Sequence, residues 1–257
     1  MTKKNIKRVL IFNPNTSESV TQSFEPILSK VQPADTEYTY WTCPTGPSLI
    51  KTSADMYESA SHCLPLLLAI AEEFDGFLGA CYADHPIVRL LQSYVHDKPV
   101  VGIFDASILA AVHLTATDSK FGVVTTGFPF ETLLAEGVYR LLGSTVRSGK
   151  TQPSSFAGVA ASGIGADDLK PEHKAAAQEK VMTATSRLLQ SHEVTVICVG
   201  GVILAGMEPW IRQACVEELG PQRGQEVMII EQLTVGALVL GMLLQQQSSC
   251  DFAPALR

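Results

Sequence analysis

The stretch Gly79-Ala80-Cys81-Tyr82-Ala83-Asp84-His85-Pro86 decides how the rest of this sequence is interpreted. The apolar run that begins at Gly76 is short enough for a buried strand, and Pro86 suits the first turn of a following helix. A cysteine between a parallel strand and a helix N-terminus lies where open α/β sheets bind ligands, and the helix dipole there favours a thiolate. The pattern predicts that Cys81 carries chemistry. A small core cysteine is the alternative.

Composition places the chain among ordinary globular proteins. Its 257 residues are 46% hydrophobic and 18% charged, which is enough to bury a core in one large domain or two small ones. The formal net charge of −7 argues against nucleic-acid and anionic-membrane partners. Six cysteines without a Cys-x-x-Cys pair predict neither a disulfide framework nor a zinc site.

We expect a cytoplasmic protein that acts on a small-molecule substrate and forms a homo-oligomer. The basic N-terminus up to Arg8 precedes an apolar run too short for a signal peptide, and the longest apolar runs are interrupted before they could span a membrane. The sequence contains no phosphate-binding glycine loop of the Lys-Ser/Thr type and no His/Cys cluster at metal spacing. We therefore predict that the protein needs neither a cofactor nor a metal.

Strand-like apolar runs alternate with helical stretches along the first half of the chain. The predicted strands are 8–12, 37–41, 76–80 and 99–104, and the predicted helices are about 18–31, 53–74, 86–93 and 105–113. Strands that alternate with helices predict a parallel sheet covered on both faces.

The second half repeats this order. The run Lys120–Gly127 ends in hydroxyls, Thr195–Gly201 corresponds to the strand that leads to Cys81, and Val227–Glu231 corresponds to the strand before Asp105. We predict an α/β fold of two pseudosymmetric parallel-sheet domains with the active site in the cleft between them. The first domain is 1–112 plus 224–257, which is discontinuous and carries Cys81, and the second is 113–223. The alternative is that any two strand–helix units look alike.

Polar residues follow several of the predicted strands. Asn13, Asn15 and Thr16 follow the first strand, and they could cap the next helix or offer donors to a substrate carbonyl or carboxylate. His85 could hydrogen-bond the thiol or the substrate, or cap the helix at Pro86, and we expect Asp84 to cap that helix. In the second half, we expect 147–170 to contain a mobile loop and 172–189 to form a surface helix.

The motifs together resemble the hydantoin racemase branch of the aspartate/glutamate racemase superfamily, including its fungal allantoin-cluster-like members. The resemblance rests on Asn13-Pro14-Asn15-Thr16, Gly79-Ala80-Cys81, Asp84-His85-Pro86, 99–103, 121–126 and Ala205-Gly206-Met207. It implies two pseudosymmetric domains, no cofactor, and one cysteine from each half that exchanges protons with a carbon acid. Cys81 matches the first cysteine. The implied substrate contacts are Asn13, Asn15, Thr16, Tyr82, Thr125, Thr126 and Gly201.

The sequence departs from the family pattern at the second cysteine. The segment Val199–Met207 contains no thiol, and alignment of the two halves places Gly201 opposite Cys81. Cys198 lies three residues earlier on the opposite face of its strand, about 10 Å back at the rise of a strand, and we expect it in the core.

One thiol leaves three chemistries open. The resemblance implies an isomerase that moves a proton at an acidic carbon alpha to a carbonyl, with water, Tyr82, His85 or Glu231 in place of the second thiol. Single-cysteine decarboxylation, as in arylmalonate decarboxylases, and a cyclase or tautomerase reaction are the alternatives. A non-catalytic binding protein is a further alternative, which Gly201 favours and Cys81 opposes.

Overall fold

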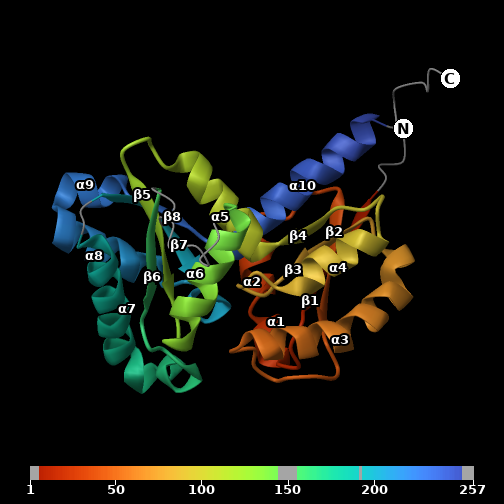
Figure 1. The fold of residues 1–257 in the computed structure, drawn as a ribbon, viewed down its shortest axis with the longest axis horizontal. Coiled ribbons are helices and arrows are strands. Elements are labelled where there is room, and N and C mark those ends of the chain that lie inside the picture. Colours follow the sequence, from red (N-terminus) through yellow and green to blue (C-terminus); the bar gives the residue numbers. More distant parts are fainter. Residues whose placement is uncertain (1–5, 144–154, 191–192, 251–257) are drawn as a thin grey trace. The chain divides into compact units, whose positions relative to one another are not determined.

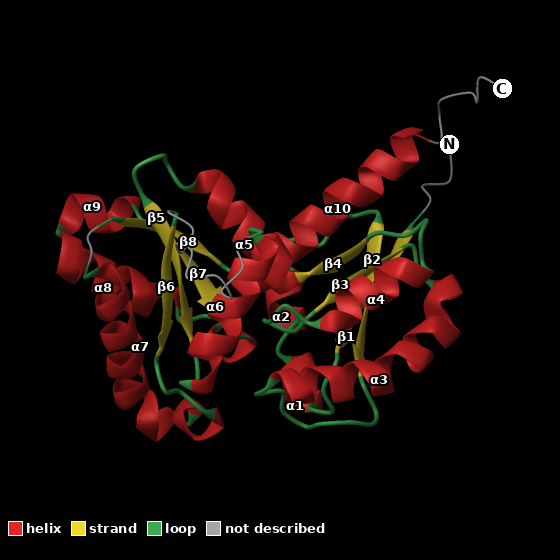
Figure 2. Cartoon of the chain, viewed as in Figure 1, coloured by secondary structure: helices red, strands yellow, loops and turns green. Residues whose placement is uncertain are grey.

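The computed structural model describes residues 6–143, 155–190 and 193–250. These residues form two compact units, and each unit is built on a four-stranded parallel β-sheet (Figure 1, Figure 2). The first unit comprises the chain up to Cys81, His85–Ala106 and the chain from Leu233. The second comprises Tyr82–Asp84 and Ser107–Gln232.

The first sheet has the strand order β2-β1-β3-β4, and all neighbouring strands are parallel. Its strands are β1 (Lys7–Asn13), β2 (Thr36–Thr42), β3 (Gly76–Gly79) and β4 (Val100–Gly102). β1 and β3 are central. A central strand with both faces covered needs a continuous apolar run, and residues 9–12 of β1 supply it and are buried.

Helices cover this sheet and bury its apolar side chains. They are α1 (Glu18–Gln22), α2 (Glu25–Leu28), α3 (Ser53–Ile70), α4 (Pro86–Tyr94), the first residues of α5 (Ile103–Leu114) and most of α10 (Gln232–Cys250). α3 begins at a capping box in which the Thr52 hydroxyl accepts the Asp55 N–H and the Asp55 carboxylate accepts the Thr52 N–H. One core cluster includes Phe12 and Phe77 of the strands, Leu67 of α3 and Leu91 of α4.

The second sheet has the strand order β6-β5-β7-β8 and is also parallel throughout. Its strands are β5 (Lys120–Thr125), β6 (Phe156–Ala161), β7 (Val194–Gly200) and β8 (Met228–Ile230). The helices of this unit are the remainder of α5, α6 (Pro129–Leu141), α7 (Lys174–Leu189), α8 (Glu208–Leu219) and α9 (Pro221–Glu226). A short 3-10 turn, Val202–Leu204, follows β7.

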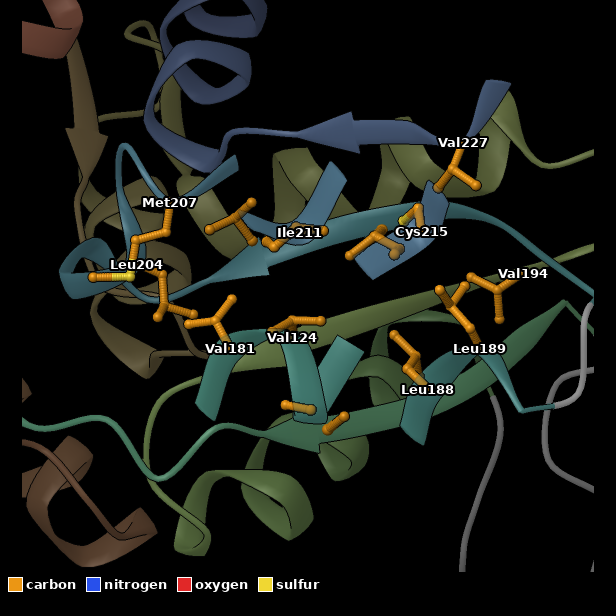
Figure 3. Close-up of a cluster of buried hydrophobic side chains, with 14 of the residues drawn as sticks. Val124, Val181, Leu188, Leu189, Val194, Leu204, Met207, Ile211, Cys215 and Val227 are labelled. Carbon is orange, nitrogen blue, oxygen red and sulfur yellow. The ribbon is translucent and has the colours of Figure 1, made fainter. Parts of the chain in front are cut away.

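The core of the second unit lies between its strands and helices α7 and α8 (Figure 3). Val124 of β5, Val181 and Leu188 of α7, and Ile211 and Cys215 of α8 contribute to one cluster. β5 and α7 approach so closely that a Cβ atom at Gly122 would lie 2.6 Å from Leu188 Cδ2. A side chain at position 122 would therefore have to displace the Leu188 side chain.

The two sheets share one topology, which confirms the predicted pair of parallel α/β halves. In each, the first strand along the chain is central and the second is an edge strand. The third and fourth strands follow on the other side of the first. β1 thus corresponds to β5, and β3 corresponds to β7.

Some predicted elements differ from the structure. The helix expected at about 18–31 is two short helices, α1 and α2. The strand expected at 99–104 ends at Gly102, and α5 begins at Ile103. A Cβ atom at Gly102 would lie 2.9 Å from the Asp105 carboxylate, so glycine leaves room for the first turn of α5 to fold over the strand end. Of the segment expected to hold a mobile loop, residues 156–161 form β6, and residues 147–154 lie outside the described residues.

Candidate active site

Cys81 lies just beyond the carboxyl edge of the first sheet. β3 ends at Gly79, and the Ala80 N–H still donates to the Phe12 carbonyl of β1 at 2.9 Å, so Cys81 is the first residue beyond this pairing. Gly79 allows the close packing of this strand end, because a Cβ atom there would lie 3.0 Å from Phe12 and 3.2 Å from Val88. Cys81 and the residues that follow β1 therefore come after neighbouring strands, at the same edge of the sheet.

The Cys81 thiol is neutral at rest. The residue is half-buried, and burial raises the pKa of its thiol to about 12. The helix-dipole argument from the sequence predicted a thiolate. Desolvation disfavours the charged form and outweighs that effect here. Cys81 is thus placed to donate a proton, and it must first be deprotonated before it can accept one.

Asn13 holds together the turn that follows β1. Its side chain is 1% exposed, and its Nδ2 donates to Asn15 Oδ1, the Ser17 carbonyl and Thr21 Oγ1 at 2.9–3.1 Å. Its Oδ1 accepts the Asn15 N–H at 3.2 Å. These bonds fix the turn on β1. Ser17 is the N-cap residue of α1, and its side chain makes no capping bond to the helix.

Asn15 and Thr16 are half-buried in the same turn. Asn15 Oδ1 accepts the Ser17 N–H at 2.8 Å in addition to its bond from Asn13. The Thr16 N–H donates to the Pro47 carbonyl at 3.2 Å. The backbone N–H groups of residues 15, 16 and 17 are therefore all used within the protein.

Two buried residues of α3 hold this turn through contacts to one of its carbonyl oxygens. Ser59 Oγ donates to the Pro14 carbonyl at 2.6 Å, and Cys63 Sγ reaches the same oxygen at 3.3 Å. Burial, followed by the nearby Cys43 thiol, raises the pKa of Cys63. Sequence reasoning missed both residues. The only signal was a serine and a cysteine four residues apart on the buried face of a helix.

His85 is the N-cap of α4. Its Nδ1 accepts the Ile87 N–H at 3.2 Å, and the side chain is 2% exposed. Because Nδ1 accepts a hydrogen bond from the Ile87 N–H, the neutral ring carries its own proton on Nε2. Of the roles left open by the sequence, capping is confirmed for His85. Its catalytic role stays a prediction.

Asp84 does not cap α4, which corrects the expectation for that residue. Its carboxylate pairs with the Arg140 Nε at 2.8 Å, and both residues belong to the second unit. The Asp84 side chain is 14% exposed, so the pair is partly shielded from water. Arg140 lies 56 residues away in the sequence, and no local pattern could have predicted this partner.

Tyr82 also belongs to the second unit and is buried there. A Cβ atom at Gly200 would lie 3.0 Å from Tyr82 Cε1, so the ring packs directly on the end of β7. Burial, followed by Cys198, raises the pKa of Tyr82 well above its usual value. Cys198 is fully buried, as expected, and its Sγ lies 3.6 Å from the Ser107 carbonyl.

The remaining predicted contacts lie at the carboxyl edge of the second sheet. Thr125 Oγ1 donates to the Gly200 carbonyl at 2.5 Å and so links β5 to β7. Thr126 is 8% exposed. Gly201 has φ +135° and lies beside Thr126, whose Cγ2 would be 3.3 Å from a Cβ atom at position 201. Leu204, which precedes the Ala-Gly-Met motif, is fully buried in the core.

The predicted site residues thus form two groups, each within one unit. Asn13, Asn15, Thr16, Cys81 and His85 lie in the first. Tyr82, Thr125, Thr126 and Gly201 lie in the second. Within the described ranges, no three His, Cys, Asp or Glu side chains are grouped as a metal site would need, and no helix is long and apolar enough to cross a membrane.

Comparison with known proteins finds relatives and solved structures that are similar to this chain over much of its length. An uncharacterized protein of Schizosaccharomyces pombe is 29% identical over 239 residues, which cover 93% of this chain and 92% of the relative. A hydantoin racemase of a Pseudomonas strain is 30% identical over 130 residues, which are half of each chain. The crystal structure of allantoin racemase from Pseudomonas fluorescens shares the fold at a TM-score of 0.75 and 24% identity, covering 93% of this chain and 91% of the other. The sequence profile of the Asp/Glu/hydantoin racemase family matches residues 9–237, and the chain belongs to that family.

Proposed function

We propose that this protein is a cofactor-independent isomerase that moves a proton at an acidic carbon alpha to a carbonyl. The substrate would be a small hydantoin or an amino-acid-like compound. The observation that carries the proposal is the position of Cys81, the half-buried thiol at the carboxyl edge of the first sheet, beside the polar turn 13–17. The names of its relatives, hydantoin and allantoin racemases, support the substrate class.

In the proposed reaction, Cys81 is the single thiol acid and base. Its thiolate takes the alpha proton, which leaves a neutral thiol and an enolate. Return of a proton from the thiol to the same face only exchanges the hydrogen, and slower delivery of a proton from water to the opposite face completes the isomerisation, after which the thiol gives its proton to water. Hydrogen-bond donors near the carbonyl oxygen stabilise the enolate. Because the resting pKa is about 12, only a small fraction of the thiol is ionised near neutrality. We therefore expect the rate to rise about tenfold with each pH unit below that value.

The neutral thiol also favours a second candidate, a single-cysteine decarboxylase. A substrate carboxylate would leave as carbon dioxide, and its bonding electrons would form a carbanion on the alpha carbon. The Cys81 thiol would protonate that carbanion, and water would return a proton to the thiolate. This reaction starts from the protonated thiol, so we expect its rate to stay level across neutral pH.

Hydrogen–deuterium exchange at the alpha carbon tests the proposal. Small hydantoins, amino acids and malonates would be incubated with the enzyme in heavy water at several pH values and followed by proton NMR. We expect Cys81→Ser to lower exchange at least about 100-fold, as expected for lost general acid–base catalysis. The matched control is Cys215→Ser, because Cys215 lies in the core of the second unit. Near-normal exchange in Cys81→Ser would remove Cys81 from the mechanism.

A further inference from the structure

The segment between β3 and α4 carries the Cys81 thiol, and the chain changes units twice within it. Cys81 and His85 belong to the first unit, whereas residues 82–84 between them belong to the second. The chain re-enters the first unit at His85, the N-cap of α4. Because Cys81 is bonded directly to this excursion, the position of its thiol depends on how residues 82–84 are held in the second unit.

A ring contact and an ion pair hold residues 82–84 in the second unit. The Tyr82 ring packs on the end of β7 and is buried there. The Asp84 carboxylate accepts a hydrogen bond from the Arg140 Nε of α6 at 2.8 Å. On the other side of Cys81, the Ala80 N–H donates to β1. Cys81 thus lies between a strand pairing in one unit and an ion pair in the other.

The surroundings of the ion pair make it a firm support for this segment. The side chain of Asp84 is 14% exposed, and that of Arg140 is 51% exposed. Fully exposed ion pairs contribute little, whereas a carboxylate that is mostly buried is left with an uncompensated charge when its cation is lost. Arg140 Nη1 also lies 3.9 Å from the Glu136 carboxylate, one turn earlier in α6. The guanidinium is therefore held by its own helix while it pairs with Asp84.

We infer that Arg140 is a positioning residue for the proposed reaction: it pairs with Asp84 and so fixes the segment on which Cys81 lies. The inference rests on the proposed function and deepens it, because it names a residue of α6 that determines where the thiol meets the alpha carbon. Arg140 needs no contact with the substrate for this role. Position matters because a misplacement of about 1 Å can slow a reaction about 100-fold.

Arg140→Met and Asp84→Asn break the ion pair with little change in side-chain size. We expect each variant to slow deuterium exchange of a hydantoin about 10-fold to 100-fold through kcat, with KM within about threefold of wild type, because a displaced thiol leaves binding intact. The double variant should be no slower than either single variant, since both changes remove one interaction. Arg140→Lys keeps a cation beside Asp84, and we expect it to retain exchange within about threefold of wild type.

Alkylation of Cys81 reports the state of the segment without any reference to the reaction. When the ion pair is broken, the segment should release Cys81, which is half-buried in the wild type, into water. We therefore expect iodoacetamide at about pH 8 to modify Cys81 at least about fivefold faster in Arg140→Met and Asp84→Asn. The matched control is the Asp168–Lys180 ion pair of the same unit, 2.6 Å long with side chains 17% and 43% exposed. Asp168→Asn should leave alkylation and exchange unchanged.

The two readouts should change in opposite directions, and this separates a positioning role from a change in thiol burial alone. Faster alkylation together with faster exchange would show that the ion pair only keeps the thiol from water, and would overturn the inference. Wild-type alkylation of Cys81 in the folded variants would also overturn it. Urea denaturation verifies folding, and Asp84→Asn decides the test if Arg140→Met does not fold. If the wild type shows no exchange, the proposed reaction fails, and alkylation still decides whether Arg140 holds the Cys81 segment.

Discussion

At the residue scale, the surroundings of Cys81 set the protonation state of its thiol. A free cysteine has a pKa near 8.5, and burial raises that of Cys81 to about 12. The folded state therefore keeps a proton that the unfolded chain loses above about pH 8.5. The protonated Cys81 thiol therefore contributes to the free energy of unfolding. That contribution is fully present below about pH 8.5 and is lost as the pH rises towards 12.

Alkylation measures this pKa directly. We expect iodoacetamide to modify Cys81 slowly near neutral pH, because only the thiolate reacts. The rate should rise about tenfold per pH unit towards pH 12 while the protein stays folded. Peptide mapping by mass spectrometry assigns the modified residue, with Cys81→Ser as the blank. A rate at Cys81 that levels off near pH 7 would show a thiolate at rest and contradict this description.

Gly201 has a backbone conformation that disfavours a side chain. Its φ of +135° lies where side chains other than glycine are strained, and Thr126 lies close to its missing Cβ. The family resemblance suggests that Gly201→Cys would restore a two-thiol site. The backbone makes that restoration costly.

We expect Gly201→Cys and Gly201→Ala each to lower the free energy of unfolding by ~1–3 kcal/mol, the usual cost of such strain. Urea denaturation measures it. Gly165→Ala is the matched control, because its φ of −127° is extended and no heavy atom would lie within 4 Å of the added Cβ. Wild-type stability in both Gly201 variants would mean that position 201 accepts a side chain without strain.

At the scale of elements, α3 supports the turn that follows β1. Ser59 and Cys63 lie one helical turn apart, and both reach the Pro14 carbonyl. A thiol is a weaker donor than a hydroxyl, so Ser59 contributes the stronger of the two bonds. The position of Asn15 and Thr16 thus depends on a helix that begins at residue 53.

We expect Ser59→Ala to lower the free energy of unfolding by about 1–2 kcal/mol, because a buried carbonyl loses its better donor. Ser61→Ala is the control on the same helix, since Ser61 is exposed and its hydroxyl donates to the Glu58 carbonyl within the helix. Chemical denaturation of both variants gives the comparison. Equal stabilities would show that Cys63 alone is enough to hold the turn.

The predicted strands were more reliable than the helix boundaries, for physical reasons. The runs at 9–12, 120–125 and 194–200 are apolar because both faces of a central strand are buried, and this signal is local. β6 was missed because it is an edge strand of small residues, Phe-Ala-Gly-Val-Ala-Ala, which resembles a loop in composition. The start of α5 depends on how Asp105 folds over Gly102, which no periodicity reports.

At the scale of the whole molecule, the repeat of strands in the sequence was enough to predict two sheets of one topology. The position of Cys81 at a strand end followed from the same pattern. The supporting contacts did not, because Ser59 meets Pro14 across 45 residues and Arg140 meets Asp84 across 56. Such contacts form only when distant elements pack, so no local sequence pattern identifies the two partners.

We propose that one thiol serves one face of the carbanion, since residues 199–207 of the second half contain no cysteine. The most direct test compares two rates on one enantiomer of a hydantoin in heavy water. Proton NMR follows deuterium entry at the alpha carbon, polarimetry follows loss of optical rotation, and an enzyme-free sample corrects for spontaneous change. We predict that deuterium enters at least about tenfold faster than rotation is lost, because the Cys81 thiol exchanges its proton with heavy water and delivers deuterium to the face from which the proton was taken. Equal rates would show a second acid on the opposite face and contradict the account.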